Sequence, residues 1–424
     1  MPWYNGICSQ ETWMRILYIA TRICWPVRSG AHLRDFHIAA YLARNAELTY
    51  IGQDPAEDNP GQPPVSVERI EALGDAEVIR VRRNTGYSMG AMIRGFIGPL
   101  TLNALNYTSP LVSEQLEKVL RSQSFDVVQI ESVLLQSYVP LIRRLAPNAL
   151  LNSDWHNIDS EVTARYAQQA PNLPRRIYAW RSATLLKNQE DELLRHCDIH
   201  TVCSERERDA LLVRSPNSNI EVIPNGVDWP SLASLTDDKS LRRNLIFVGA
   251  MDYHANIDAV LYLARDIWPA IRERRPDLKF VVVGSKPAAE ILKLAEQPGI
   301  SVTGTVPDVK PYYQTALAAV TPIRIAGGTR LKILEAMAAG VPVISTSRGA
   351  EGLPVTDGKD ILLADSVARF VECVATLDQS SGQWQRIAAE GRKLSRNYDW
   401  AVVGAKLLNF YESKPGTLTA RVES

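Results

Sequence analysis

Residues 327–346 have the sequence GGTRLKILEAMAAGVPVIST, and this stretch decides the fold. Two glycines at its start let the backbone approach a ligand closely, and Thr329 can cap the helix predicted after it. Gly340 ends that helix, and Pro342 prevents its continuation. The apolar run after Pro342 is typical of a buried strand. A glycine-rich loop, a short helix and a buried strand in this order predict an α/β protein.

The charges of this stretch suit a ligand that combines phosphate with hydroxyl groups. A helix N-terminus offers unpaired N–H groups and the positive end of the helix dipole to phosphate. Gly327 and Gly328 can contribute backbone donors, and Arg330 and Lys332 add positive charge beside them. Glu335 follows one turn later and can accept hydrogen bonds from sugar hydroxyls.

This stretch resembles the donor-binding element of retaining glycosyltransferases of the group 1 family, which have the GT-B fold. Three other segments resemble the same family, namely 220–228 (IEVIPNGVD), 245–249 (LIFVG) and 398–400 (YDW). The resemblance runs from about Met14 to Tyr411. In the N-terminal half it depends mainly on layout and on residues 154–157 (DWHN). It implies an α/β fold of two facing Rossmann-like domains with a cleft between them.

Two places depart from the family pattern. Many relatives carry two glutamates eight positions apart; Glu335 fits the second, and Gly327 stands where the first would be. Many relatives also carry Arg and Lys just after the Phe-Val-Gly strand, where this chain has Ala250 and Asn256. The basic residues of the glycine-rich stretch are therefore expected to supply the missing charge.

Composition sets the class of protein. A chain of 424 residues, 46% hydrophobic and 22% charged, should form two domains with sizeable cores. Lys plus Arg equals Asp plus Glu at 47 each, which argues against nucleic acid as a partner. The five cysteines are few and scattered, as in a reducing cytoplasm, and Trp and Tyr outside the motifs are expected in the core. No apolar run approaches the ~20 residues of a membrane span.

Strand-like and helical patterns alternate, so βα units and parallel sheets are expected. Strands are predicted at 15–20, 48–51, 77–81, 127–130, 149–152, 199–202 and 222–223, then at 245–248, 279–283, 301–303, 318–321, 341–345 and 361–363, with a long helix over 175–195. The expected organisation is an extension (1–13), an N-terminal acceptor-side Rossmann-like domain (14–228), a linker (229–240), a C-terminal nucleotide-sugar-binding Rossmann-like domain (241–397), a closing helix (398–413) and a tail (414–424).

The candidate site residues follow predicted strands, whose carboxyl ends hold the ligands of open α/β sheets. The resemblance implies His156 at the reacting sugar, Arg330 and Lys332 at the diphosphate, and Glu335 at the ribose. The full donor-binding set is Gly30, Gly249, Gly284, Gly327, Gly328, Thr329 and Glu335. Simpler interpretations remain open, because His156 could cap its loop, Gly30 could only begin a helix, and Glu335 could pair with Lys332.

No metal is expected. His196, Cys197, His200 and Cys203 are candidate ligands by residue type, but residues four apart on a strand lie about 13 Å apart at ~3.3 Å per residue. The chain has no Asp-x-Asp, the usual divalent-cation motif of the other major glycosyltransferase fold. The nucleotide diphosphate sugar is then a co-substrate, and no cofactor is expected.

Residues 86–107 are apolar and contain several glycines, and Arg80, Arg82 and Arg83 precede them. They could meet a lipid-linked acceptor or a membrane surface. The simpler interpretation is a buried pair of acceptor-side helices.

The resemblance implies a metal-independent, retaining glycosyltransferase, of hexosyltransferase type, that moves a sugar from a nucleotide diphosphate sugar to a hydroxyl acceptor. A glycan or lipid-linked acceptor in cell-surface polysaccharide or glycolipid synthesis is expected. The expected location is the cytoplasm, with peripheral contact at the inner face of the membrane as an option. Two alternatives are a nucleotide-sugar epimerase on the same architecture and a non-catalytic partner of a glycan-synthesising complex.

Overall fold

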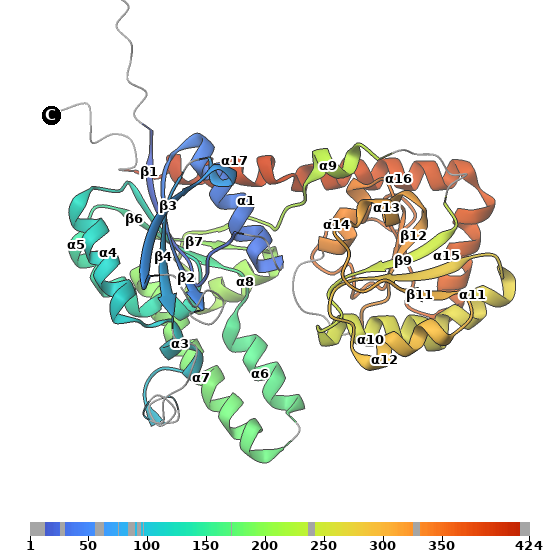
Figure 1. The fold of residues 1–424 in the computed structure, drawn as a ribbon, viewed down its shortest axis with the longest axis horizontal. Coiled ribbons are helices and arrows are strands. Elements are labelled where there is room, and N and C mark those ends of the chain that lie inside the picture. The colour runs from blue at the N-terminus through green and yellow to red at the C-terminus, as the bar shows by residue number, and fades with distance from the viewer. Residues whose placement is uncertain are drawn as a thin grey trace, which may run out of the picture. The chain divides into compact units, whose positions relative to one another are not determined.

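The computed structural model describes residues 13–25, 30–55, 63–74, 76–83, 90, 95, 97–170, 172–235, 242–324 and 331–415. The chain divides into two compact units, one of Met1–Ile223 with Gly404–Ser424 and the other of Pro224–Val403 (Figure 1). Each unit has its own sheet and core, as the two predicted Rossmann-like domains require. The expected linker begins with helix α9 (Trp229–Ala233), whose Leu232 is buried in the core of the second unit.

The first unit is built on a sheet with strand order β3-β4-β2-β1-β5-β6-β7-β8. The strands are β1 (Arg15–Ile19), β2 (Glu47–Pro55), β3 (Val65–Ile70), β4 (Ala76–Arg83), β5 (Val127–Ile130), β6 (Leu150–Trp155), β7 (Ile199–Val202) and β8 (Ile220–Val222). All neighbours pair in parallel except β3 and β4. Strand β3 was not predicted, because half of its six residues are polar and none of them is fully buried at the sheet edge.

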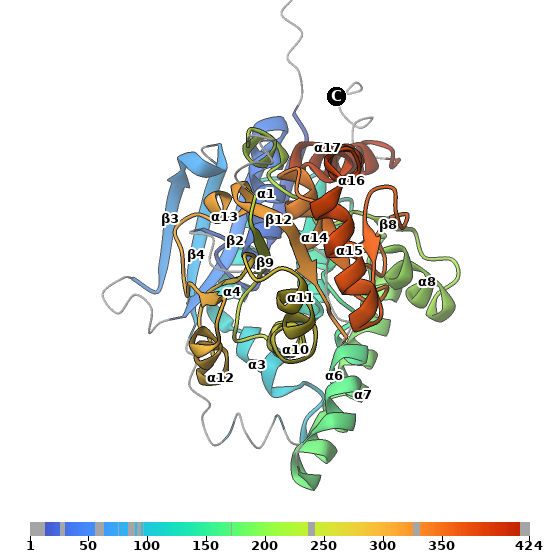
Figure 2. The same ribbon diagram turned by 90° about the vertical axis from the view of Figure 1, so that its right-hand side faces the viewer.

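Helices cover this sheet and connect its strands. They are α1 (Gly30–Asn45), α3 (Leu102–Tyr107), α4 (Pro110–Ser122), α5 (Val139–Leu145), α6 (Asp159–Gln169), α7 (Leu173–His196) and α8 (Glu205–Arg214). The predicted long helix is α7, which Asn172 begins by accepting a hydrogen bond from the Arg175 N–H. Helices α6 and α7 form a hairpin that extends away from the sheet (Figures 1 and 2). None of the helices in the described ranges is long and apolar enough to cross a membrane.

The second unit has the sheet β11-β10-β9-β12-β13-β14, and every neighbouring pair is parallel. Its strands are β9 (Asn244–Val248), β10 (Lys279–Val283), β11 (Ile300–Val302), β12 (Ala316–Thr321), β13 (Val343–Ser345) and β14 (Leu362–Leu363). In order of appearance along the chain these strands lie 3-2-1-4-5-6, which is the order of a Rossmann fold.

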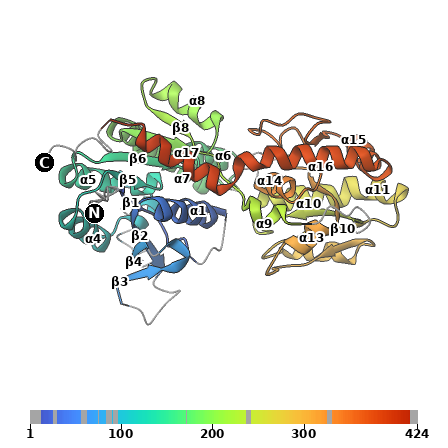
Figure 3. The ribbon, with the colours of Figure 1, turned by 90° about the horizontal axis from the view of Figure 1, so that it is seen from above.

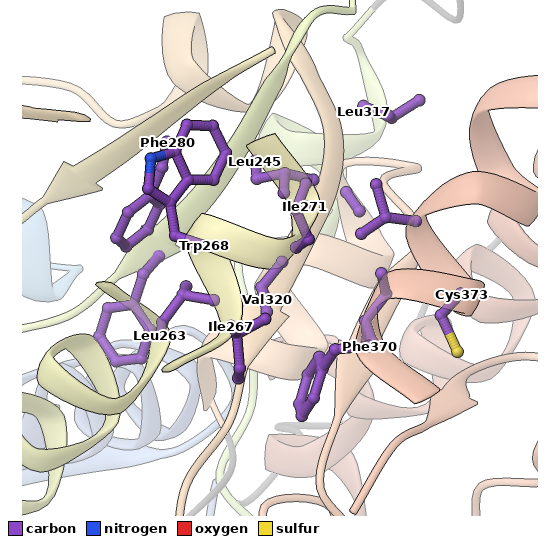
Figure 4. Close-up of a cluster of buried hydrophobic side chains, with 14 of the residues drawn as sticks. Leu245, Leu263, Ile267, Trp268, Ile271, Phe280, Leu317, Val320, Phe370 and Cys373 are labelled. Carbon is purple, nitrogen blue, oxygen red and sulfur yellow. The ribbon is translucent and has the colours of Figure 1, made fainter. Parts of the chain in front are cut away.

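The remaining helices are α10 (His254–Tyr262), α11 (Trp268–Arg274), α12 (Ala289–Leu292), α13 (Lys310–Gln314), α14 (Leu331–Ala338), α15 (Val367–Gln379), α16 (Ser381–Ser395) and α17 (Trp400–Glu412). Helices α15 and α16 pack side by side (Figure 3). On one side of the sheet, Trp268 and Phe280 share a buried cluster with Phe370 and Cys373 of α15 (Figure 4). Cys24, Cys197, Cys203 and Cys373 are buried and form no disulfide with one another.

Two of the family-like segments, 220–228 and 398–400, are hydrogen-bonded to each other. The Val227 N–H donates to the Tyr398 carbonyl at 2.7 Å, and the Trp400 N–H donates to the Val227 carbonyl at 3.3 Å. A Cβ on Gly226 would lie 2.6 Å from the Trp400 ring. Gly226 and Val227 therefore hold the segment that begins α17 within the second unit.

The predicted stop of α14 is confirmed. Gly340 has a φ of +68°, a backbone conformation that favours glycine. Its N–H donates to the Met337 carbonyl and the Val341 N–H donates to the Ala336 carbonyl, each at 2.9 Å. This is the hydrogen-bond pattern of a glycine helix stop, and the buried strand β13 follows.

Candidate functional site

The strand order of the first unit creates a switch point at β1, which pairs with β2 on one side and β5 on the other. Ligands of such sheets bind at the carboxyl ends of the strands beside that point. Thr21 lies just beyond the end of β1, Glu131 directly follows β5, and His156 directly follows β6. Asp35 comes from α1. These four residues come together where the topology places a ligand site.

His156 lies between the carboxylates of three different elements. Its Nδ1 is 3.3 Å from Glu131 Oε1, and its Nε2 is 3.3 Å from Asp35 Oδ1 and 3.5 Å from Asp154 Oδ2. The carboxylates are buried, whereas 19% of the His156 side chain is exposed. Because Nε2 itself is buried, a ligand would meet the other atoms of the ring.

A buried ion pair supports this cluster. Arg34 donates through Nε and Nη2 to the two oxygens of Asp154, at 3.3 and 2.9 Å, and through Nη1 to the Ile223 carbonyl at 2.9 Å. Thr201 donates to the same carboxylate at 2.7 Å. Removing one partner of a buried pair costs about 3–5 kcal/mol, because it leaves the other charge uncompensated. The pair therefore fixes Asp154 beside His156.

The carboxylates of Glu131 and Asp35 accept fewer hydrogen bonds from described residues than that of Asp154 does. The N–H and the hydroxyl of Thr21 both donate to Glu131 Oε2, at 3.0 and 2.9 Å, which leaves Oε1 facing His156. The Tyr18 hydroxyl donates to Asp35 Oδ1 at 3.4 Å. The other oxygen of Asp35, Oδ2, is buried without a hydrogen-bond donor among the described residues.

The carboxylates determine the charge of the ring. Burial alone would lower the pKa of His156, but Glu131 and Asp35 raise it well above its usual value, so the ring is protonated at neutral pH. Burial, with a further contribution from Asp35, raises the pKa of Glu131 to about 7. Burial alone would raise the pKa of Asp154, but Arg34 and His156 hold it well below its usual range.

The same group has the residue types of a metal site. One ligand atom from each of Asp35, Glu131 and His156 lies within 4.8 Å of the others, and no other His, Cys, Asp or Glu group in the described ranges meets this condition. A metal would need the ring unprotonated. The Arg22 guanidinium already supplies a positive charge to these carboxylates. Burial alone would lower its pKa, but Glu131 and Asp35 raise it.

The sequence identified only part of this cluster. It pointed to His156 and did not identify Asp35 or Glu131. Glu131 had a usable signal, since it directly follows a strand of four buried residues. Asp35 had a weaker signal, because a carboxylate in a helix usually faces solvent. The predicted Gly30 is the first residue of α1.

In the second unit, Gly249 and Gly284 follow β9 and β10 as predicted. A Cβ on Gly284 would lie 1.8 Å from the Gly249 carbonyl oxygen, and one on Gly249 would lie 2.8 Å from Asn256 Nδ2. The Asn256 amide donates to the Ala250 carbonyl at 2.8 Å. Gly284 therefore lets its loop pack on the loop after β9, and Gly249 leaves room for the Asn256 amide. The role of these glycines in nucleotide binding stays a prediction.

Glu335 lies on α14 and is partly buried. The Tyr313 hydroxyl is 3.5 Å from its Oε2, which is a weak hydrogen bond. Burial raises the pKa of Glu335 to about 7, and Lys332, one turn earlier, acts in the opposite direction. Lys332 Nζ lies 5.8 Å from the centroid of the Phe247 ring. The predicted Gly327, Gly328, Thr329 and Arg330 lie outside the described residues.

The cysteine and histidine residues that were considered as metal ligands contact other protein groups. Burial lowers the pKa of His200, on β7, to about 4, and the Trp155 indole donates to its Nδ1 at 3.4 Å. Cys203 donates to the Trp155 carbonyl at 3.5 Å. His196 lies 3.1 Å from Glu192 at the end of α7.

Two family models match the chain. One, described as Glycosyltransferase Family 4, matches residues 38–229, and the other, described as Glycosyl transferases group 1, matches residues 242–379. Together the two matches cover more than half of the chain.

Part of the chain is similar in sequence to known mannosyltransferases. The phosphatidyl-myo-inositol mannosyltransferase of Mycobacterium leprae is 29% identical over 203 residues, which are 45% of this chain and 53% of that protein. The chain thus spans about half the length of the first curated relatives it matches. The protein of the same name from Propionibacterium freudenreichii is 24% identical over 309 residues, 70% of this chain and 72% of that one.

Solved structures share the fold. Sucrose-phosphate synthase from Thermosynechococcus elongatus superposes with a TM-score of 0.67 at 16% identity, over 94% of this chain and 98% of that one. The Anabaena protein Alr3699/HepE in complex with UDP-glucose gives 0.64 at 14% identity, over 95% and 100%. These are GT-B structures, and the two Rossmann-like units described above agree with them. The chain therefore belongs to the group 1 glycosyltransferase family and has the GT-B fold.

Proposed function

We propose that this chain moves a sugar from a nucleotide diphosphate sugar to a hydroxyl acceptor, with retention of configuration. The observation that carries the proposal is the position of His156 among three carboxylates at the switch point of the first sheet, where Glu131 and Asp35 raise the pKa of the ring. A preorganised positive charge favours a transition state in which a diphosphate leaves, because negative charge grows on the leaving group.

The donor is assigned to the second unit. Glu335 binds the ribose hydroxyls in this proposal, since Tyr313 is the only side-chain donor to its carboxyl among the described residues, and a weak one. Lys332 and Arg330 hold the diphosphate with the backbone of residues 327–328. Gly249 and Gly284 let the nucleotide lie against the strand ends, and Gly30 is also proposed as a donor-binding residue.

The proposed retention does not use a covalent nucleophile, because the carboxylates around His156 have other partners. Asp154 is paired with Arg34, Glu131 is held by Thr21, and all three carboxylates are buried. None of them is proposed as a covalent nucleophile. Instead, the acceptor oxygen bonds to the anomeric carbon on the face from which the diphosphate oxygen departs. The acceptor proton passes to the leaving phosphate.

Metal independence is also proposed. The carboxylates of Asp35, Glu131 and Asp154 are offset by the His156 ring and by Arg22 and Arg34. The leaving diphosphate is stabilised by the basic residues of the glycine-rich stretch. Turnover should therefore survive EDTA. Loss of turnover with EDTA and its recovery with magnesium would overturn this part of the proposal.

The acceptor and the setting are proposed from the relatives. Two of them are named phosphatidyl-myo-inositol mannosyltransferases, which supports a hexosyl donor and a glycan or lipid-linked acceptor. Synthesis of cell-surface polysaccharide or glycolipid at the cytoplasmic side of a membrane is the setting that agrees with such an acceptor.

Product analysis tests the proposed reaction against its alternatives. Nucleotide sugars are first screened by thermal shift, where a ligand at ~100 times its dissociation constant stabilises by about 2.7 kcal/mol. The stabilising donor is then incubated with the protein. A transferase slowly releases nucleoside diphosphate to water, whereas an epimerase isomerises the sugar. A non-catalytic partner does neither, and either of these last two outcomes would overturn the proposal.

A further inference from the structure

The α6–α7 hairpin packs through small side chains. Ala167 of α6 and Ala179 of α7 are buried in this hairpin, and small residues let two helices approach closely. The hairpin extends away from the sheet of the first unit (Figures 1 and 2). Several of its large apolar side chains are exposed instead.

Those large apolar side chains lie on the outside. Leu173 is 67% exposed and Ile177 is 60% exposed, and Trp180 is also exposed. Spacings of four and three residues put these three side chains on one face of α7. Val162 and Tyr166, one turn apart on α6, are exposed as well. The expectation that Trp and Tyr outside the motifs lie in the core is wrong for Tyr166 and Trp180, and also for Trp13, Trp25 and Tyr253.

The same part of the hairpin is positively charged. Residues 162–181 contain Arg165, Arg175, Arg176 and Arg181 and no Asp or Glu, although the whole chain has a formal net charge of zero. The first three arginines are exposed. Their side chains make no ion pair with another described residue. An apolar helix face next to unopposed arginines has the character of a membrane-surface helix.

Arg181 connects the hairpin to a segment that carries one more exposed apolar side chain. It donates to the Gly95 carbonyl at 2.9 Å and to the Gly98 carbonyl at 2.5 Å. Ile97, between these two glycines, is 80% exposed. It belongs to the stretch 86–107, for which a membrane surface was one of two interpretations.

We propose that the distal half of the α6–α7 hairpin docks on a bilayer that contains anionic lipids. Trp180 and Tyr166 lie at the level of the headgroups, while Leu173 and Ile177 enter the boundary of the acyl chains. The arginines meet the lipid phosphates. Docking does not depend on the proposed transfer reaction, but it would bring the protein to a lipid-linked acceptor.

Sedimentation with vesicles of phosphatidylglycerol and phosphatidylcholine, compared with pure phosphatidylcholine, tests this docking. The wild type should bind the anionic vesicles more tightly. Arg165→Gln/Arg175→Gln/Arg176→Gln should weaken that binding by about fivefold per arginine, or roughly a hundredfold together. Leu173→Asn/Ile177→Asn should weaken it by about tenfold or more. All five side chains are exposed, so the variants should fold.

Matched controls make the same changes elsewhere. Arg265→Gln/Arg274→Gln/Arg386→Gln and Val213→Asn/Leu292→Asn also alter exposed side chains, and both should bind vesicles as the wild type does. The docking proposal is overturned if the wild type ignores anionic vesicles, or if hairpin and control variants bind equally. It is also overturned if the hairpin variants abolish a lipid-free dimer in ultracentrifugation instead. Donor hydrolysis should persist in the hairpin variants, which separates this proposal from the transfer reaction.

Discussion

Glu131→Gln removes the negative charge that faces His156 and keeps the size of the side chain. The amide oxygen can still accept the two hydrogen bonds from Thr21 that now hold Glu131 Oε2. The carboxylate oxygen 3.3 Å from His156 Nδ1 loses its charge. The variant therefore tests whether this carboxylate keeps the ring protonated.

The structure sets the size of the effect. Two unit charges 3.3 Å apart attract by about 5 kcal/mol at an effective dielectric constant of ~20. This is an upper bound, since the pKa of Glu131 is raised to about 7 and the carboxyl is partly protonated at neutral pH. Opposite charges at this range usually change a pKa by about 1 to 3. The pKa of His156 should therefore fall by about 1 to 3 in Glu131→Gln.

The sign of the change also predicts its effect on stability. A His pKa raised in the folded state stabilises the protein fully below about pH 6.5, and this stabilisation is lost as the pH rises through the folded-state value. Glu131→Gln lowers the folded-state pKa of His156. The stabilisation by the ring should therefore disappear at a lower pH than in the wild type.

NMR titration of the histidine Cε1 protons measures this pKa, with His156→Asn to assign the signal. The wild-type ring should remain protonated well above its usual pKa of about 6.5, and in Glu131→Gln it should titrate at lower pH than in the wild type. His200, whose pKa burial lowers to about 4, should not titrate above about pH 5 in either protein. Glu335→Gln, which changes a carboxyl with a similarly raised pKa in the other unit, is the matched control. A wild-type His156 pKa near 6.5, or an equal pKa in Glu131→Gln, would refute the reasoning.

Three further predictions concern the second unit. Glu335→Ala should weaken nucleotide affinity roughly tenfold to a hundredfold in a calorimetric titration, and unchanged affinity would rule out the ribose role. Lys332→Ala or Arg330→Ala should lower kcat about 10²- to 10³-fold at saturating donor with unchanged circular dichroism. Near-normal kcat in both variants would mean that other residues stabilise the diphosphate. Gly284→Ala should lower the thermal stability by about 1–3 kcal/mol, because its Cβ would lie 1.8 Å from the Gly249 carbonyl oxygen, and an unchanged Tm would contradict that packing.

Most of the fold could be predicted because its strands are continuous apolar runs between glycines and helical segments. The prediction for residues 279–283 matches β10, where four of five residues are buried. Strand β3 was missed because it is a half-buried edge strand with polar residues and no apolar run. Its pairing with β4 is antiparallel, which the alternation of strands and helices does not indicate.

The site could be predicted only where one residue has a local signal. His156 was identifiable because it follows a buried strand within a family-like motif. Its surroundings depend on strand order, which brings together residues far apart in sequence. Arg34 and Asp154, for example, are separated by 120 positions and form a buried ion pair. No local pattern gives the contacts of Asp35 or Glu131 with the ring, because these contacts arise only when β1, β5 and β6 lie side by side.

For the α6–α7 hairpin, the long helix was predicted from the sequence but its exposed apolar face was not. The helical pattern of α7 was identified, but the pattern alone does not say which apolar face is covered. Leu173, Ile177 and Trp180 would normally be assigned to a core. The structure leaves them exposed, whereas Ala167 and Ala179 of the same hairpin are buried.

The release of nucleoside diphosphate from the donor that binds most tightly tests the transferase proposal most directly. It should be measured for the wild type and for His156→Asn, with donor affinity determined in parallel. The proposal predicts slow release by the wild type. It also predicts that His156→Asn still binds the donor but releases the diphosphate at least about tenfold more slowly, because the fixed positive charge is gone. Release by neither protein from any nucleotide sugar, or equal release by both, would contradict it.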